Sequence, residues 1–175
     1  MNFLSPQAVV KSFQIPGSAH VADIGAGAGF FTMALARLLS DGGEMYAVEV
    51  SRDMVTRLEH ELKNHHIKNT HVLWGDVEKM GGTKLGDASM DAVVMANTLF
   101  SVSDRDTCAR EIARILKKGG QIFVIDWKDS FGHMGPHPDH VVTRAAAEKI
   151  FARHGFAVSR EFPAGSHHYG VVFKK

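Results

Sequence analysis

The stretch His20-Val-Ala-Asp-Ile-Gly-Ala-Gly-Ala-Gly-Phe-Phe-Thr32 decides the fold of this chain. A short apolar run ends in Asp23, three glycines follow at alternate positions, and a helical pattern begins at once. Glycine costs backbone entropy, so this density indicates a turn where a ligand approaches the main chain closely. Dinucleotide-binding turns have the spacing G-x-G-x-x-G, but counted from Gly25 the last glycine position is Phe30. The stretch therefore disfavours a nucleotide-cofactor oxidoreductase.

Size and composition predict one globular domain spanning residues 1–175. The chain is 45% hydrophobic and 22% charged, and a domain of this length buries roughly 70% of its unfolded surface. A formal net charge of +1 argues against a strongly basic nucleic-acid-binding face. The start, Met-Asn-Phe-Leu-Ser-Pro, lacks signal-peptide features, and no apolar run approaches the ~20 residues of a membrane span. We therefore expect a cytoplasmic protein, in which the lone Cys108 is a buried structural thiol.

Strand and helix patterns alternate along the chain, which is typical of a parallel sheet with helices on both faces. Strands are predicted at about His20–Ile24, Glu44–Val50, Thr70–Trp74, Asp91–Ala96 and Gln121–Asp126. Helices are predicted at about Ser5–Gln14, Phe30–Leu39, from Ser51 past Leu62, from Ser103 or Asp104 to about Lys118, and at Val141–His154. Gly119-Gly120 is predicted to end the preceding helix, which has cationic residues in its last turn.

The C-terminal part predicts a hairpin. Two β-like runs, about Ala157–Phe162 and His167–Lys174, are separated by only Pro163-Ala-Gly-Ser166. A connection this short joins antiparallel neighbours, because a parallel crossover needs a dozen or more residues.

Four further segments accompany the glycine turn. They are Tyr46-Ala-Val-Glu49-Val50-Ser51, Trp74-Gly75-Asp76-Val77-Glu78, Asp91-Ala-Val-Val-Met-Ala-Asn97-Thr98-Leu99-Phe100 and Leu116-Lys-Lys-Gly-Gly-Gln-Ile-Phe-Val-Ile-Asp-Trp127. With them, the chain from Phe3 to Lys175 resembles the class I S-adenosylmethionine-dependent methyltransferases. It is most similar to the small-molecule branch related to the ubiquinone and menaquinone C-methyltransferases. The resemblance implies an α/β fold: a Rossmann-like, doubly wound, seven-stranded sheet with the last strand antiparallel.

The same resemblance implies a cofactor, S-adenosyl-L-methionine, with S-adenosyl-L-homocysteine as product. Ligands of open α/β sheets bind beyond the carboxyl ends of the strands. The cofactor would lie against the Gly25–Gly29 turn. The helix start at Phe30 would favour the cofactor's carboxylate, and Asp23 would face its ammonium group. Glu49 would accept hydrogen bonds from the ribose hydroxyls. The predicted cofactor-binding residues are Asp23, Gly25, Ala26, Gly27, Gly29, Phe30, Glu49, Val50, Met54, Asp76, Val77 and Asn97, of which Val50, Met54, Asp76 and Val77 would surround adenine.

The methyl acceptor is expected to be a small molecule. The segment at Asn97 is not Asn/Asp-Pro-Pro-Tyr/Phe, the pattern of exocyclic-amine methylation on nucleic-acid bases, so a nucleic-acid acceptor is disfavoured. Methyl transfer is an in-line displacement to which an enzyme contributes mostly by positioning. A general base is needed only when the nucleophile must lose a proton.

Residues that could contact an acceptor lie in the long segment Trp127–His140, which would act as a lid. His133 and His137 are the candidate catalytic residues. With His140 they invite a metal interpretation, but Gly135, Pro136 and Pro138 break helical ligand spacing, and no metal is predicted. A solvent or core role is favoured over catalysis for His167-His168.

Several alternatives stay open. The connections at about Val77–Met90 and Ser101–Ser103 are short, so the acceptor site would be open or completed by a second protomer in a homodimer. The absence of a larger inserted lid also keeps open a cofactor-binding module or partner subunit without chemistry of its own. A protein or RNA methyltransferase is a further alternative, with the near-neutral charge weighing against RNA.

Overall fold

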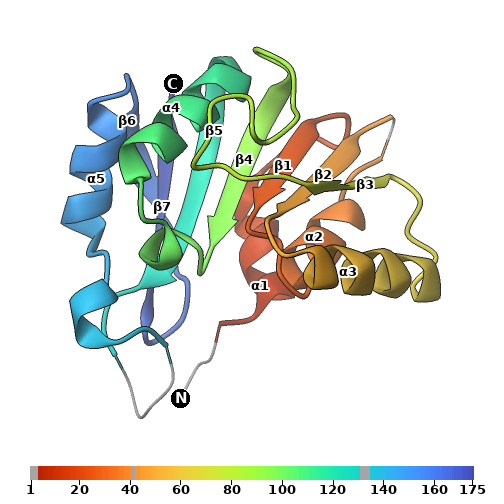
Figure 1. Ribbon diagram of the computed structural model, residues 1–175, viewed down its shortest axis with the longest axis horizontal. Coiled ribbons are helices and arrows are strands. Elements are labelled where there is room, and N and C mark those ends of the chain that lie inside the picture. Colours follow the sequence, from red (N-terminus) through yellow and green to blue (C-terminus); the bar gives the residue numbers. More distant parts are fainter. Residues whose placement is uncertain (1–3, 41, 131–134) are drawn as a thin grey trace.

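The central sheet has seven strands in the order β3-β2-β1-β4-β5-β7-β6 (Figure 1). The structure is a computed structural model that describes residues 4–40, 42–130 and 135–175. The strands are β1 His20–Ile24, β2 Glu44–Glu49, β3 Thr70–Trp74, β4 Met90–Ala96, β5 Leu116–Trp127, β6 Ala157–Glu161 and β7 His168–Lys174. The helices are α1 Pro6–Val10, η1 Lys11–Phe13, α2 Phe30–Ala36, α3 Arg52–Asn64, η2 Leu99–Ser101, α4 Arg105–Ile115, η3 Pro138–His140 and α5 Arg144–Ala152.

The strand directions confirm the predicted fold class. The pairs β3–β2, β2–β1, β1–β4 and β4–β5 are parallel, whereas β7 is antiparallel to both β5 and β6. The predicted hairpin is therefore present, and its second strand lies between β5 and β6. The middle strands are apolar along nearly their whole length because helices cover both faces of the sheet.

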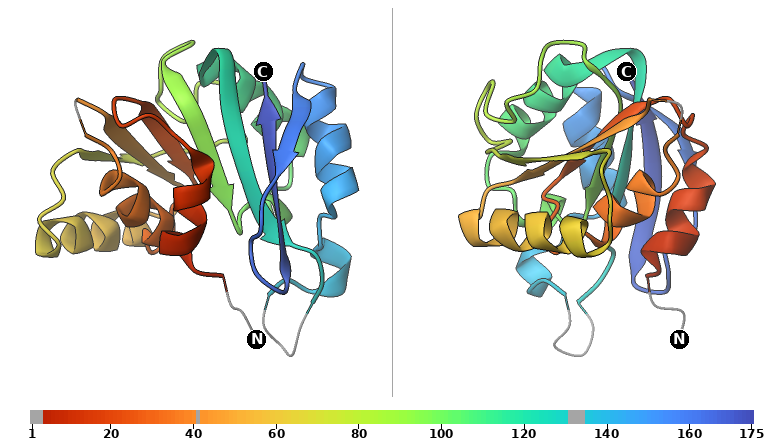
Figure 2. Two further views of the ribbon diagram at one scale, coloured as in Figure 1. Left: turned by 180° about the vertical axis from the view of Figure 1, so that it is seen from behind. Right: turned by 90° about the vertical axis from the view of Figure 1, so that its right-hand side faces the viewer.

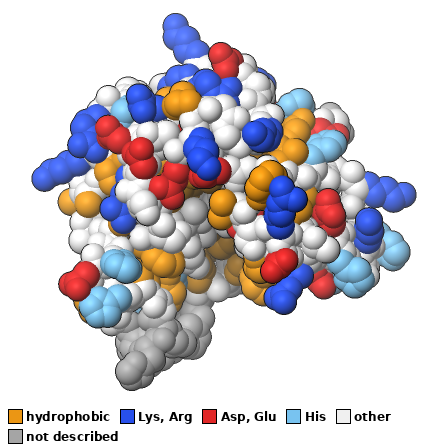
Figure 3. Space-filling view, in the orientation of Figure 1, with side chains coloured by type: hydrophobic (Ala, Val, Ile, Leu, Met, Phe, Trp, Pro, Cys, Tyr) orange, Lys and Arg blue, Asp and Glu red, His pale blue; other side chains and the backbone are white. Residues whose placement is uncertain are grey.

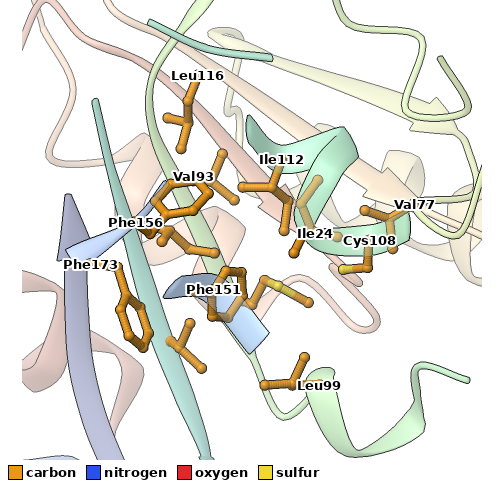
Figure 4. Packing of buried hydrophobic residues seen from close by; sticks show 14 of the residues in the cluster. Ile24, Val77, Val93, Leu99, Cys108, Ile112, Leu116, Phe151, Phe156 and Phe173 are labelled. Atoms are coloured by element: carbon orange, nitrogen blue, oxygen red, sulfur yellow. The ribbon is translucent and has the colours of Figure 1, made fainter. Parts of the chain in front are cut away.

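Two layers of helices cover the sheet, as the two views of Figure 2 show. On one face, α1, η1 and α2 pack on side chains such as Val21, Val94 and Phe123, and α3 packs Leu58 and Leu62 beside them. On the other face, α4 and α5 enclose the larger core, which contains Ile112, Phe151 and Phe173 (Figure 4). Cys108 lies in this core, fully buried, which confirms its structural role.

The prediction for the end of the fourth long helix was wrong. We expected it to reach about Lys118 and stop at Gly119-Gly120, but α4 ends at Ile115 and β5 begins at Leu116. Leu116 has an extended backbone, is fully buried and pairs with Met90; the pairing then continues from Ala92 with Gln121. Tertiary pairing of a buried leucine thus outweighs the local pattern of cations and glycines, and residues 117–120 bulge from the strand.

The carboxyl ends of the parallel strands lie along one edge of the sheet. From β1 the chain moves outward through β2 and β3, and it then returns to β4 and continues on the other side through β5. This reversal of strand order between β1 and β4 opens a crevice at their carboxyl ends, where ligands bind in open α/β folds. Within the described residues, no helix is long and apolar enough to cross a membrane.

Candidate functional site

The glycine turn after β1 brings three glycines into left-handed backbone conformations, with φ of 74° at Gly25, 52° at Gly27 and 79° at Gly29. A Cβ atom on Gly25 would lie 2.5 Å from Oγ1 of Thr98, and one on Gly29 would overlap Cδ1 of Leu58. A Cβ atom on Gly27 would approach nothing nearer than the Gly25 carbonyl oxygen, at 3.9 Å. Two of the glycines therefore permit close packing, whereas Gly27 keeps space open.

The turn is held in place by the end of β2. The amides of Gly25 and Ala26 donate to the carbonyl oxygen of Val48, at 2.9 and 3.2 Å. Glu49 is buried, and its carboxylate accepts from the Gly27 amide through Oε2 and from the Ser51 amide through Oε1, both at 2.9 Å. These bonds fix the carboxylate, and each oxygen keeps acceptor capacity for a ligand hydroxyl.

Asp23 lies beneath the turn and is only 2% exposed. The hydroxyl of Thr32 on α2 donates to its Oδ2 at 2.6 Å. Burial raises the pKa of Asp23 to about 6; the Thr32 hydrogen bonds oppose this rise, and the nearby Glu49 carboxylate adds to it. A buried carboxylate of this kind is well suited to bind a cationic group, because a bound cation favours its ionised form.

The segments that follow β3 and β4 also lie at the edge formed by the carboxyl ends of the parallel strands. Asp76 accepts from the Glu78 amide at 3.0 Å and pairs with Nζ of Lys79 at 2.9 Å, and the hydrogen bond from Lys79 lowers its pKa. Asn97 has a φ of 55°, and its amide donates to the carbonyl oxygen of Ile125 at 2.8 Å. The Thr98 hydroxyl donates to the carbonyl oxygen of Ile24 at 3.1 Å, which ties the end of β4 to the end of β1.

Two cavities adjoin at this edge, and they share Gly25 and Asn97. The smaller has a volume of about 350 Å³ and is lined by Ile24, Gly25, Val48, Glu49, Val50, Gly75, Asp76, Val77, Glu78, Asn97, Thr98, Ser101 and Val102. The larger, of about 650 Å³, is lined by Leu4, Pro6, Asp23, Gly25, Ala26, Gly27, Ala28, Phe30, Phe31, Ala96, Asn97, Trp127 and His168. Figure 3 shows the molecule hollowed near the centre of the face of Figure 1, with hydrophobic side chains bordering the hollow.

Most of the predicted cofactor residues lie around these two cavities. Glu49, Val50, Asp76 and Val77 line the smaller one. Asp23, Ala26, Gly27 and Phe30 line the larger one. Gly29 and Met54 line neither; Gly29 packs against Leu58, and the Met54 amide donates to the Ser51 hydroxyl that caps α3.

The candidate catalytic histidines are placed differently. His133 lies outside the described residues. His137 precedes η3 with its side chain 69% exposed, accepts a hydrogen bond from the Asp139 amide and lines neither cavity. A catalytic role for His137 stays a prediction. Among the described residues, no three His, Cys, Asp or Glu side chains are grouped closely enough to hold a metal ion.

The sequence analysis missed one residue of the larger cavity, His168, and included Trp127 only as the first residue of the predicted lid segment. Trp127 at the end of β5 and His168 at the start of β7 are paired across the two strands and line the cavity together. For His168 we had favoured a solvent or core role. The alternation of side chains along β7 could have placed it on the cavity side, but only once the pairing with β5 was known.

Comparison with known proteins agrees with this fold. A family model described as "Methyltransferase domain" matches residues 22–124. The structure of a SAM-dependent methyltransferase from Aquifex aeolicus is similar, with a TM-score of 0.89 and 28% identity, over 98% of this chain and 90% of that one. The fold is that of the class I S-adenosylmethionine-dependent methyltransferases, as the sequence predicted. The chain belongs to the methyltransferase domain family, and S-adenosylmethionine is the cofactor of this class.

The chain also matches parts of longer curated proteins. An arsenite methyltransferase from Aquipseudomonas alcaligenes is 28% identical over 112 residues, 61% of this chain and 32% of that protein. A ubiquinone/menaquinone biosynthesis C-methyltransferase from Vibrio campbellii is 26% identical over 113 residues, 64% of this chain and 42% of that protein. The chain thus spans less than half the length of these curated relatives.

Proposed function

We propose that this chain transfers the methyl group of S-adenosylmethionine to a small, largely apolar acceptor. The observation that carries the proposal is the pair of adjoining cavities that share Gly25 and Asn97. One cavity is bordered by the carboxylates of Glu49 and Asp76, the other mainly by apolar side chains. The names of the arsenite and quinone methyltransferases among its relatives agree with a small-molecule acceptor.

The residues present fit the cofactor. Space over Gly27 admits a ligand close to the backbone, and Asp23 offers a buried carboxylate for the ammonium group. Glu49 is fixed by two amides for contact with the ribose hydroxyls, and Asp76 with Val77 borders the space for adenine. When bound, the cofactor supplies an electrophilic methyl group on a sulfonium.

The larger cavity would hold the amino-acid end of the cofactor beside Asp23 and Gly27, and the rest of its space would hold the acceptor. Its walls include Phe30, Phe31, Trp127 and Ala96, and its polar side chains are Asp23, Asn97 and His168. These walls would exclude water and hold a nucleophile in line with the methyl group near Gly25 and Asn97. Such positioning can lower a barrier by about 7–11 kcal/mol in favourable cases. Homodimer formation stays a prediction.

We expect acceptor-dependent formation of S-adenosylhomocysteine. The purified chain would be incubated with S-adenosylmethionine and a panel of phenols, quinols and arsenite, with product followed by mass spectrometry. Turnover above the blank without acceptor is expected for small ring acceptors and absent in a Gly27→Val variant. If S-adenosylhomocysteine binds but no member of the panel is methylated, the proposal fails and a binding module or partner subunit is favoured.

Affinity for S-adenosylhomocysteine is expected to decrease as the pH is lowered from 7 to 5. Because the folded protein raises the pKa of Asp23 to about 6, the free carboxyl is ionised above that pH and protonated below it. The ligand's α-ammonium belongs to a free amino acid and has a pKa above this range, so it keeps its charge throughout. Binding should weaken by up to about tenfold per unit below pH 6. Calorimetry at several pH values measures this slope.

The matched variant for the pH experiment is Asp23→Asn. It keeps the size of the side chain and removes the titration, so its affinity should be low and nearly independent of pH between 5 and 7. A pH slope as steep as that of the unmodified protein would show that another group binds the ammonium.

A further inference from the structure

Asp126, near the end of β5, is a buried carboxylate at the edge of the sheet where the two cavities adjoin. It is fully buried, and its carboxylate accepts hydrogen bonds from backbone amides. Oδ1 accepts from the Trp127 amide at 2.8 Å, and Oδ2 accepts from the Phe100 amide at 3.2 Å. The second bond connects β5 to η2, the short helix that follows β4. Asp126 therefore joins two segments that border different cavities.

A carboxylate is an expensive side chain in this position. Ile122 and Val124, which lie on the same side of β5, belong to the apolar core. Burial of a charged group costs free energy that its hydrogen bonds must offset, whereas an apolar side chain packs in such a core without that cost. The presence of a carboxylate is therefore better explained by what it holds at the edge of the sheet than by the stability of the core.

The helix η2 depends on contacts from outside for its position. It consists of only three residues, Leu99–Ser101, and so short a turn has little stability of its own. Asp126 holds its amide side through Phe100. Arg105, at the start of α4, holds its carbonyl side. Its Nε donates to the Leu99 carbonyl oxygen at 3.2 Å, and its Nη2 donates to the Phe100 carbonyl oxygen at 3.4 Å.

The same turn carries one wall of the smaller cavity. Thr98, Ser101 and Val102 line that cavity. The Ser101 hydroxyl donates to the Thr98 carbonyl oxygen at 2.7 Å, and the Thr98 hydroxyl donates to the Ile24 carbonyl oxygen at 3.1 Å. These residues form one connected wall with η2, so a displacement of η2 would change the shape of the cavity.

We propose that Asp126 is a positioning residue for the cofactor: through the Phe100 amide it fixes η2, and with η2 the wall that faces the adenosine part of S-adenosylmethionine. This inference rests on the proposed function, which puts the adenosine part in the smaller cavity and the amino-acid part beside Asp23. Asp126 itself does not touch the ligand. Loss of its carboxylate should weaken binding of the adenosine part and leave the contact of Asp23 with the amino-acid part intact.

The test compares two ligands at about pH 7.5, where Asp126 is ionised although burial raises its pKa to about 6. S-adenosylhomocysteine carries both parts of the cofactor, whereas adenosine carries only the part expected in the smaller cavity. Calorimetry measures the affinity of S-adenosylhomocysteine, and its displacement by adenosine gives the affinity of adenosine.

Asp126→Asn keeps the size of the side chain, but its amide group offers one acceptor oxygen in place of two. We expect both ligands to bind about tenfold more weakly to this variant. Asp23→Asn should show a different pattern, in which S-adenosylhomocysteine binds more weakly and adenosine binds as before. A purely structural role for Asp126 would not weaken binding of adenosine to the folded variant.

Two further variants separate positioning from stability. Arg105→Ala releases the carbonyl side of η2 from a half-buried position and should weaken both ligands about threefold. Asp91→Ala is the matched control. At the opposite edge of the sheet, the Asp91 carboxylate accepts from the His20 amide at 2.9 Å and pairs with Lys117 at 2.6 Å, and it lines neither cavity. Its loss should lower the melting temperature and leave both affinities unchanged.

The results that overturn the inference can be told apart from failure of the proposed function. Unchanged affinities in folded Asp126→Asn, or an equal loss in Asp91→Ala, refute the role of Asp126 and leave the cofactor site in place. If Asp126→Asn does not fold, unchanged affinities in Arg105→Ala refute it instead. If S-adenosylhomocysteine binds to the unmodified protein but adenosine does not displace it, the inference alone fails. If S-adenosylhomocysteine does not bind at all, the proposed function fails with it.

Discussion

Replacement of Gly27 by valine is expected to abolish binding of S-adenosylhomocysteine while the protein stays folded. A side chain at this position meets no protein atom nearer than 3.9 Å from its Cβ, so it projects into the larger cavity. There it would occupy the space that the cofactor needs. We expect a loss of affinity of about 100-fold or more, equivalent to about 2.7 kcal/mol. Calorimetric titration measures the loss.

The variant also carries a backbone cost, because φ at Gly27 is 52° and valine disfavours this region. Such strain destabilises a protein by about 1–3 kcal/mol. Gly155→Val is a matched control: Gly155 also has a positive φ of 83°, no atom lies within 4 Å of its Cβ position, and it lines neither cavity. The two variants should lose similar thermal stability, but only Gly27→Val should lose the ligand. Full affinity in Gly27→Val would show that the cofactor does not lie over the turn.

Replacement of Glu111 by alanine is expected to cause a large loss of stability. Glu111 is on α4 and fully buried, and its carboxylate accepts from the amide of Gly81 at 2.8 Å, the amide of Thr83 at 3.2 Å and the hydroxyl of Thr83 at 2.6 Å. It also accepts from Nε and Nη2 of Arg114, both at 2.8 Å. Removing one member of a buried ion pair typically costs about 3–5 kcal/mol, because its partners are left unpaired.

For a domain of this size, that loss corresponds to a fall in melting temperature of about 10 °C. Scanning calorimetry measures it, and Glu59→Ala on the exposed surface of α3 should change the melting temperature little. Burial alone would raise the pKa of Glu111, but hydrogen bonds from Arg114 and Thr83 hold it at about 2. The stability that Glu111 contributes is therefore present above about pH 4.5 and is lost as the pH falls toward 2. A melting temperature insensitive to Glu111→Ala would contradict this account.

The strands of the parallel part could be predicted from the sequence because each is an apolar run bounded by residues of turns and caps. The bounds of β1 and β3 agree with the prediction at both ends. The glycine turn, Glu49 and Asp76 were predicted because each lies at or just after the end of such a run, and the carboxyl ends of parallel strands share one edge. The local sequence pattern was therefore sufficient for the strands and for the residues at their carboxyl ends.

Features that depend on contacts between distant segments were not predictable in this way. The early end of α4 depends on the pairing of Leu116 with Met90. We predicted a solvent or core role for His168, because the side of the sheet on which it lies is determined by the register between β7 and β5, which the sequence does not show. Likewise, the three glycines look equivalent in the sequence, and only the neighbouring Thr98 and Leu58 show that Gly25 and Gly29 permit packing.

The insertion of β7 between β5 and β6 has a consequence for synthesis on the ribosome. The residues that line the smaller cavity lie between Ile24 and Val102, so they emerge long before His168. Until β7 has been made, the apolar strand β5 has an unpaired edge, and such an edge invites pairing with other chains. A growing chain can therefore complete the smaller cavity early, whereas the wall of the larger one arrives with β7. Slow translation before this strand would prolong the period in which β5 is vulnerable to aggregation.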